Sequence, residues 1–177
     1  MKSSLHTLTL GLSLALSGLS ANSTLAQNLV SQGHPSIVTS ASDSGKITAN
    51  LQAALNYAAF WNTGERHYAD AALADNFTDR NLPVGRVQGK AGALQASANF
   101  RAAVPDLRAN IEEILISGEQ IILRLRFTGH FSGKLGTTQG RGQSIDFAAV
   151  DIYRIANGKI SDNWHLEDMH QFFQQIQ

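Results

Sequence analysis

Two side chains near the C-terminus could act together on a small molecule: the carboxylate of Asp168 and the indole of Trp164. They are four residues apart in a segment predicted to be extended, so they should point to the same side of the chain. If that side lines a pocket, desolvation would raise the pKa of Asp168 toward the range useful for proton transfer. The alternative is that Asp168 caps a C-terminal helix. His165 and Glu167 alternate away from Asp168, and we expect them on a solvated or dimer face.

Two aromatic side chains, Tyr57 and Trp61, lie one turn apart in a predicted helix near the start of the domain. They could form walls of a pocket for a flat ligand. The alternative is a place in the core, which is more common for aromatic residues at helical spacing.

The composition excludes several classes of function. The 14 Lys and Arg residues balance the 14 Asp and Glu residues, so no net field attracts nucleic acid or an anionic membrane. The absence of cysteine excludes disulfides, thiolate metal sites and a cysteine nucleophile. The histidines show no recognisable spacing of metal ligands, and we expect no metal site.

Residues 1–26 are typical of a signal peptide, because Lys2 precedes an apolar run from Leu8 to Leu19 and small residues follow at the expected cleavage position. The run is shorter than the roughly 20 residues that a membrane-spanning helix needs; the alternative is an uncleaved anchor. We therefore expect an exported protein, periplasmic or secreted and free of the membrane after cleavage. Its mature N-terminus at 27–46 should be flexible, and one domain should occupy 47–177.

Hydrophobic periodicity predicts the elements that position these residues. Apolar residues recur at three and four residues in the predicted helices, which are Ile47 to Gly64, Glu65 to about Leu73, and Ala93 to Pro105. Beyond Pro105 the period changes to two, and the predicted strands are Leu107 to Ile116, Ile121 to Phe131, Ser144 to Ile155 and Lys159 to Leu166, before a last helix after Asp168. This order predicts an α+β fold in which three to four helices pack on a curved antiparallel sheet and enclose a pocket.

From about Gly89 to the C-terminus, the chain resembles the SnoaL-like polyketide cyclase (ester cyclase) branch of the nuclear transport factor 2-like superfamily. The matching segments are VPDLRANIEEILISGEQIILRLRFTG, GKLGTTQGRGQ, DIYRIANGKI and NWHLED. The resemblance implies a cone-shaped domain that forms homodimers through the outer face of its sheet. It also implies ring closure by an intramolecular aldol reaction, with an acidic side chain as general acid and base and without a metal or cofactor. Asp168 is the matching carboxylate, in a Trp-x-x-x-Asp arrangement with Trp164.

The chain departs from the family at the end of the central strand. Many relatives have Gly-Thr-His-x-Gly there, with the histidine turned into the pocket, whereas residues 129–133 read GHFSG. Phe131 then takes the place of the histidine as a pocket residue. His130, the candidate partner of Asp168, would face the other way unless a bulge at Gly129 restores its direction. Arg154, in the family's Arg-Ile-x-x-Gly-Lys-Ile arrangement, either faces the cavity and orients an anionic group or forms a structural ion pair.

Two functions follow from these observations. The first is a lyase or isomerase that acts without a cofactor on a small hydrophobic or aromatic carbonyl compound, with Asp168 moving a proton between carbon and oxygen. The second is an exported, non-catalytic protein that binds a hydrophobic ligand, which the signal peptide and the displaced histidine favour. A hydrolase that uses Asp168 to activate water cannot be separated from the first by sequence.

Overall fold

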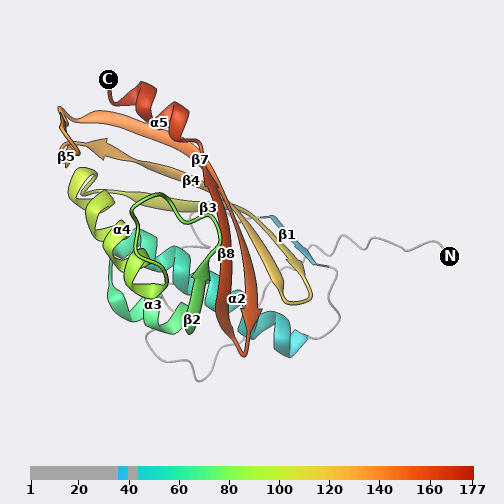
Figure 1. Cartoon of the computed structure of the whole chain (residues 1–177). Coiled ribbons are helices and arrows are strands. Elements are labelled where there is room, and N and C mark those ends of the chain that lie inside the picture. The colour runs from blue at the N-terminus through green and yellow to red at the C-terminus, as the bar shows by residue number, and fades with distance from the viewer. Residues whose placement is uncertain (1–35, 40–43) are drawn as a thin grey trace.

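The computed structural model describes residues 36–39 and 44–177 (Figure 1). The predicted signal peptide at 1–26 lies outside the described residues. Within the described ranges, no helix is long and apolar enough to cross a membrane.

In the described part of the chain, four helices form where the sequence predicts them, and their bounds are α2 Ser44–Thr63, α3 Arg66–Ala72, α4 Lys90–Ala103 and α5 Met169–Gln175. Helix α2 buries small and aromatic residues on one face and ends just before Gly64, whose φ of 75° suits glycine. Helix α4 ends two residues before Pro105, because the residue before a proline is biased out of the helical region.

Six strands form one mixed sheet in the order β1-β3-β4-β7-β8-β2, with bounds β1 Ser36–Thr39, β2 Leu73–Asp79, β3 Arg108–Ser117, β4 Gln120–Phe131, β7 Gln143–Ala156 and β8 Lys159–Glu167. The four central strands are antiparallel, as predicted. The edge strands β1 and β2 pair in parallel with β3 and β8. Each edge strand reaches the sheet through a long connection that contains helices, which permits a parallel pairing that a short hairpin cannot make.

Two further differences from the sequence prediction concern loops. Residues 36–39 form β1 and α2 starts at Ser44, although no strand or helix was expected within 27–46. The glycine-rich segment between β4 and β7 contains a small hairpin, β5 Lys134–Leu135 and β6 Thr138–Gln139. These elements are too short to give a hydrophobic period, so their formation depends on the neighbours against which they pack.

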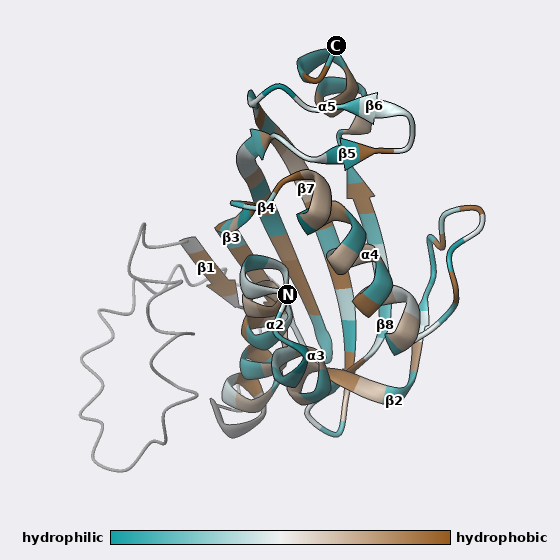
Figure 2. Ribbon diagram, turned by 90° about the vertical axis from the view of Figure 1, so that its left-hand side faces the viewer, coloured by the Kyte–Doolittle hydropathy of each residue, from teal (hydrophilic) through white to brown (hydrophobic). Residues whose placement is uncertain are grey.

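The sheet is strongly curved, and its two faces differ. Figure 2 shows α2, α3 and α4 on one side of the sheet, with α5 and the β5–β6 hairpin at one end. Alternate residues of β4 and β7 that face these helices are almost fully buried, and the largest of them are Ile121, Leu123, Leu125, Phe131, Ile145, Phe147 and Tyr153. The structure therefore confirms the α+β fold in which helices cover one face of a curved sheet.

The opposite, outer face of the sheet carries ion pairs and partly exposed apolar residues. Arg126 pairs with Glu112 and Asp146, each at 2.7 Å. Val150 and Leu166, which lie opposite each other on β7 and β8, are 37% and 74% exposed. The apolar side chains of this face are left without cover within the described part of the chain.

Candidate functional site

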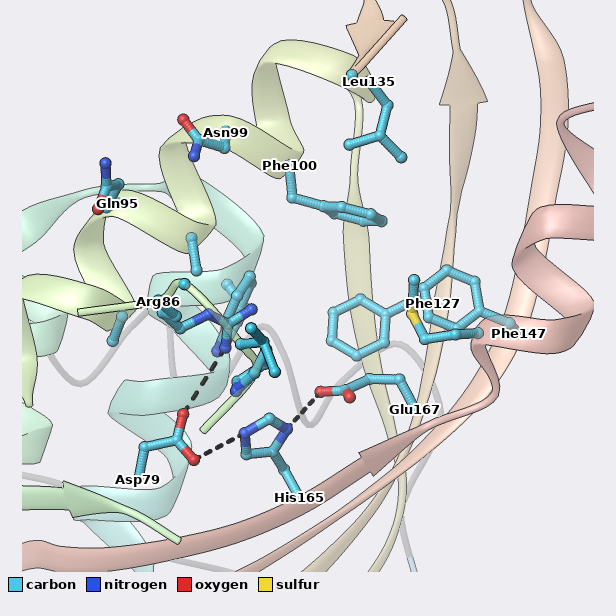
Figure 3. A pocket seen from close by; sticks show the side chains of 18 of the residues that line it. Asp79, Arg86, Gln95, Asn99, Phe100, Phe127, Leu135, Phe147, His165 and Glu167 are labelled. Carbon is cyan, nitrogen blue, oxygen red and sulfur yellow. Dashed lines mark hydrogen bonds and ion pairs between the residues drawn. The ribbon is translucent and has the colours of Figure 1, made fainter. Parts of the chain in front are cut away.

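A cavity of about 830 Å³ lies between the inner face of the sheet and the helices. Its walls come from α2, α4, α5, the β5–β6 hairpin and the loop of residues 80–89 that joins β2 to α4. Figure 3 shows that the two ends of the cavity differ, because aromatic side chains gather at one end and charged ones at the other.

The apolar end is built mainly from aromatic rings. Phe127 and Phe147, opposite each other on β4 and β7, stack with centroids 5.4 Å apart. Phe100 of α4 meets the edge of Phe147 at 6.2 Å. Leu135 and Met169 complete this end. A flat, apolar ligand would be surrounded here by ring faces and edges, the contacts that aromatic groups prefer.

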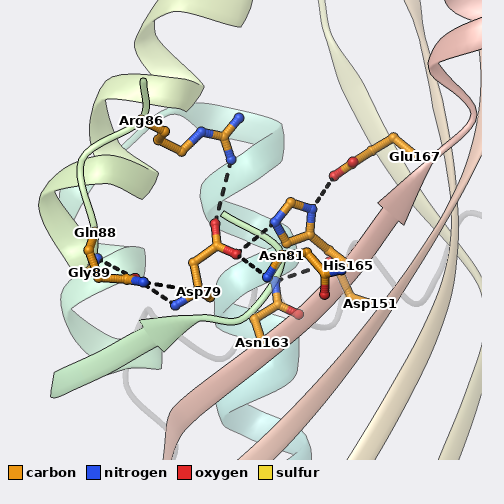
Figure 4. A network of polar contacts seen from close by, with 9 residues as sticks. All are labelled: Asp79, Asn81, Arg86, Gln88, Gly89, Asp151, Asn163, His165 and Glu167. Atoms are coloured by element: carbon orange, nitrogen blue, oxygen red, sulfur yellow. Dashed lines mark hydrogen bonds and ion pairs between the residues drawn. The ribbon is translucent and has the colours of Figure 1, made fainter. Parts of the chain in front are cut away.

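The polar end is organised around His165. Its Nδ1 lies 2.8 Å from Glu167 Oε1 and its Nε2 lies 3.0 Å from Asp79 Oδ1 (Figure 4). Both partners are carboxylates that only accept, so both ring nitrogens must donate and the ring is an imidazolium. Asp79 Oδ1 also accepts from the backbone N–H of Asn81 at 2.9 Å, which holds the carboxylate in place.

The interaction between His165 and its carboxylate partners shifts the pKa values of His165 and Glu167. Desolvation by itself would lower the pKa of His165, but the hydrogen bond and charge of Glu167, together with the charge of Asp79, outweigh it and raise the pKa to about 9. Burial would raise the pKa of Glu167, but the hydrogen bond and charge of His165 hold it below its usual value. These residues therefore form an ion-pair network at neutral pH.

A third carboxyl group, Asp151, lies on β7 directly opposite His165 on β8. It accepts a hydrogen bond from the Tyr153 hydroxyl at 2.7 Å and a long one from Asn163 Nδ2 at 3.5 Å. Burial raises the pKa of Asp151 to about 6, despite the opposing effect of the Tyr153 hydrogen bond. Asn163 Oδ1 is buried and has no hydrogen-bond partner among the described residues, although Asn163 lines the cavity.

The predicted pair, Trp164 and Asp168, does not line the cavity. Trp164 packs on the outer face, with the guanidinium groups of Arg154 and Arg80 at 5.2 and 6.0 Å from its ring. Asp168 is exposed and caps α5, where its Oδ1 accepts from the backbone N–H of Gln171 at 2.9 Å. The alternation along β8 was inferred correctly, but the inward face carries Asn163, His165 and Glu167 instead.

Three other predicted site residues also lie away from the cavity. His130 is exposed, and its ring bonds to Asp106 at 2.7 Å, so it does not approach Asp168. Phe131 is fully buried in the core. Arg154 forms the structural ion pair, at 3.5 Å from Asp162 Oδ2 on the outer face.

Tyr57 and Trp61 do line the cavity, from the buried side of α2. Burial raises the pKa of Tyr57, with the charge of Asp151 contributing in the same direction. Within the described ranges, no group of three or more His, Cys, Asp or Glu residues is arranged to hold a metal ion. Both nitrogens of His165 donate to carboxylates and leave no lone pair for a metal.

Sequence reasoning missed Asp79, Arg86 and Asp151, and placed His165 and Glu167 on the wrong face. Asp151 left a signal, because it is the one carboxylate among the inward-facing residues of β7. The sequence gives no such signal for Asp79 and Arg86. Asp79 lies at the end of an edge strand and Arg86 in a loop, where no hydrophobic period marks the buried side.

The model of the SnoaL-like polyketide cyclase family matches residues 51–176. A Bacillus cereus protein that is provisionally named a polyketide cyclase is 35% identical, with a TM-score of 0.72 over 79% of this chain and 89% of that one. TsrD from Streptomyces laurentii is 19% identical, with a TM-score of 0.66 over 77% of this chain and 98% of that one, and shows a shared fold. None of the curated proteins matches. From the family match and the Bacillus cereus relative we conclude that this chain belongs to the SnoaL-like polyketide cyclase family.

Proposed function

We propose that the cavity is the active site of a cofactor-free lyase or isomerase, which closes a ring in a small carbonyl compound by general acid–base catalysis. The observation that carries the proposal is Asp151, a buried carboxyl group that lines the cavity and has a pKa of about 6. A group with a pKa near the working pH both accepts and returns protons efficiently. The pKa of Glu167 is lowered, so its carboxylate is a weaker base.

In the proposed reaction, the Asp151 carboxylate removes a proton from the carbon next to a ligand carbonyl. The C–H bond breaks, and its electron pair forms the C=C bond of an enolate. The enolate carbon then attacks a second carbonyl of the same molecule, which forms the new C–C bond. The resulting alkoxide takes the proton back from Asp151, so the carboxylate is regenerated and the product carries a hydroxyl group. That hydroxyl could donate to Asn163 Oδ1, the buried acceptor without a described partner.

The network around His165 supports this division of roles. Both of its nitrogens are held by carboxylates at 2.8 and 3.0 Å, so it cannot move a proton without breaking a hydrogen bond. Its positive charge lies opposite Asp151 and lowers the pKa of that carboxyl group, while burial raises it. His165 is therefore a positioning residue that tunes the base.

The experiment measures proton transfer on a simple ketone, because removal of the proton next to a carbonyl can be followed without the natural substrate. The protein is incubated with 2-tetralone in D₂O, and NMR measures how fast the hydrogens next to the carbonyl exchange for deuterium. We expect Asp151→Asn to slow the catalysed exchange by at least about 100-fold, the lower range for the loss of a general base. Asp168→Asn is the matched control, because it changes an exposed carboxyl outside the cavity and keeps a good capping residue.

Retained exchange in a folded Asp151→Asn protein would contradict the proposal. The alternative function is the non-catalytic binding of a hydrophobic ligand, which the apolar end of the cavity favours. If the wild-type protein releases a co-purified apolar molecule unchanged and does not accelerate the exchange of 2-tetralone hydrogens, then the protein is a carrier of that molecule. Mass spectrometry of a solvent extract identifies such a ligand.

A further inference from the structure

Arg86 is a cation in the cavity wall whose hydrogen-bonding capacity is largely unused. Its side chain is 30% exposed and lines the polar end (Figure 3). Among the described residues, its guanidinium group forms one ion pair, at 3.7 Å from Asp79 Oδ2, and no hydrogen bond. That distance is longer than a hydrogen bond, and a guanidinium group has five N–H donors.

The loop of residues 80–89 holds Arg86 in this place. The backbone N–H of Arg86 donates to the Pro83 carbonyl at 3.0 Å, and Gly85 in this turn has a φ of 84°. Gln88 ties the loop back to β2, because its side chain accepts from the Asp79 N–H at 2.7 Å and donates to the Asp79 carbonyl at 3.0 Å. The loop passes so close to α4 that a Cβ on Gly92 would lie 1.7 Å from the Val87 carbonyl oxygen.

Other arginines of the domain are used differently. Arg126 donates to Glu112 at 2.7 Å, and Arg80 donates to Asp162 at 2.6 Å. These are short, charge-assisted hydrogen bonds that occupy the guanidinium donors. Arg86 has no such bond within the described part of the chain, although Asp79 is within reach. Its free donors therefore remain available to a ligand.

We propose that Arg86 is a catalytic residue that binds the ligand oxygen on which negative charge develops when a proton is removed. The inference rests on the proposed function and specifies the ligand class: a compound with an apolar ring system and an enolisable or phenolic oxygen. The ring occupies the aromatic end around Phe127 and Phe147, and the oxygen meets Arg86. When Asp151 takes the proton, one negative charge moves from its carboxylate to the ligand oxygen, so the cavity's total charge is unchanged.

The test uses 4-nitrophenol, whose phenolate and phenol forms absorb at different wavelengths, and 4-nitroanisole, which has the same ring without an acidic oxygen. Equilibrium dialysis measures the binding of each compound, and the absorption spectrum identifies the bound form of the phenol. We expect wild-type protein to bind the phenolate, and Arg86→Gln to bind it about 10- to 100-fold more weakly, the range for a lost hydrogen bond to a charged group. Binding of 4-nitroanisole should change less than about twofold.

Two further variants complete the experiment. Arg66→Gln, which removes an arginine that is 73% exposed and lies on α3, should bind both compounds like the wild type. Asp151→Asn should keep or strengthen phenolate binding, because it removes a nearby negative charge, even if it abolishes proton exchange. The binding result therefore stands or fails separately from the proposed reaction.

The proposal is overturned if Arg86→Gln binds the phenolate as tightly as the wild type, or if the wild type binds only the neutral phenol. It is also overturned if Arg86→Gln weakens phenolate and 4-nitroanisole binding equally, since Arg86 would then shape the cavity without recognising the oxygen. Arg86→Lys keeps the positive charge, and we expect it to restore part of the lost affinity for the phenolate.

Discussion

His165 is protonated at neutral pH because of its neighbours, and this makes it a structural cation as well as part of the site. Its side chain is only 9% exposed, so the two hydrogen bonds to carboxylates are poorly replaced by water. A buried charge without its partners is strongly unfavourable, and the carboxylates and the imidazolium must be present together. The polar end of the cavity therefore stays assembled only while His165 is charged.

The stability of the domain should decrease at alkaline pH. Because the pKa of His165 rises from 6.5 to about 9 on folding, its stabilisation is fully present below pH 6.5 and is lost as pH rises through about 9. The decrease in the free energy of unfolding is on the order of 3 to 4 kcal/mol, because the rise from 6.5 to about 9 is worth about 1.4 kcal/mol per pKa unit. Urea denaturation below pH 6.5 and above pH 9 measures it for the wild type and for His165→Gln.

The variant should lose this pH dependence. His130→Gln, which replaces an exposed histidine outside the cavity, is the matched control and should keep the wild-type decrease. An equal decrease in the wild type and in His165→Gln would show that another group is responsible.

At the scale of elements, the side chain of Asn62 bonds α2 to β3 through two hydrogen bonds. Asn62 Nδ2 donates to the Ala109 carbonyl, and Asn62 Oδ1 accepts from the Ala109 N–H, both at 2.8 Å. Both residues are buried. This pair of bonds sets the position of α2 against the sheet, and α2 in turn carries Tyr57 and Trp61 to the cavity wall.

Removing this side chain should destabilise the whole domain. We expect Asn62→Ala to lower the free energy of unfolding by about 2 to 6 kcal/mol, because two buried backbone groups lose their partners at about 1 to 3 kcal/mol each. Asn56→Ala is the control on the same helix, because its side chain bonds only to Gln52 at the surface. Chemical denaturation measures both variants. A loss in Asn62→Ala no larger than in Asn56→Ala would mean that water replaces these bonds.

The orientation of β8 explains why Trp164 and Asp168 were wrongly predicted to line the pocket. Residues 163, 165 and 167 of β8 share one face, and Trp164 and Leu166 share the other. The resemblance to the family's Trp-x-x-x-Asp arrangement places the face with Trp164 toward the pocket. In the structure, Trp164 is covered by the side chains of Arg80 and Arg154, whereas the polar face meets Asp79 and Asp151.

At the scale of the whole molecule, the outer face of the sheet is the surface through which we expect two copies to pair. Leu166 is 74% exposed, and Val150 beside it is 37% exposed. Trp164 and Ile152, the next pair along β7 and β8, are partly buried. A second copy would cover these apolar side chains, and Arg126 and Asp146 would lie at the margin.

Sedimentation velocity tests this pairing. We expect the wild-type protein to be a dimer and Leu166→Lys to weaken the dimer at least about tenfold, since a charge in the centre of an apolar contact must be desolvated. Val84→Lys places the same charge at a fully exposed apolar residue of the 80–89 loop, away from the sheet, and should remain a dimer. A monomeric wild type, or a dimer that Leu166→Lys leaves intact, would exclude this face.

The sequence by itself determined the order of the helices and central strands, the α+β class and which side chains of each strand share a face, because these depend on local periods of 3.6 and 2. It also identified Tyr57 and Trp61 as candidate cavity residues. Only the tertiary structure decided which face of β8 is turned inward, since alternation is the same for either choice. It also brought Asp79, and with it Arg86, to His165, although Asp79 and His165 are 86 residues apart in the sequence. The curvature of the sheet and the packing of the 80–89 loop on α4 produce that contact, and neither follows from a local pattern.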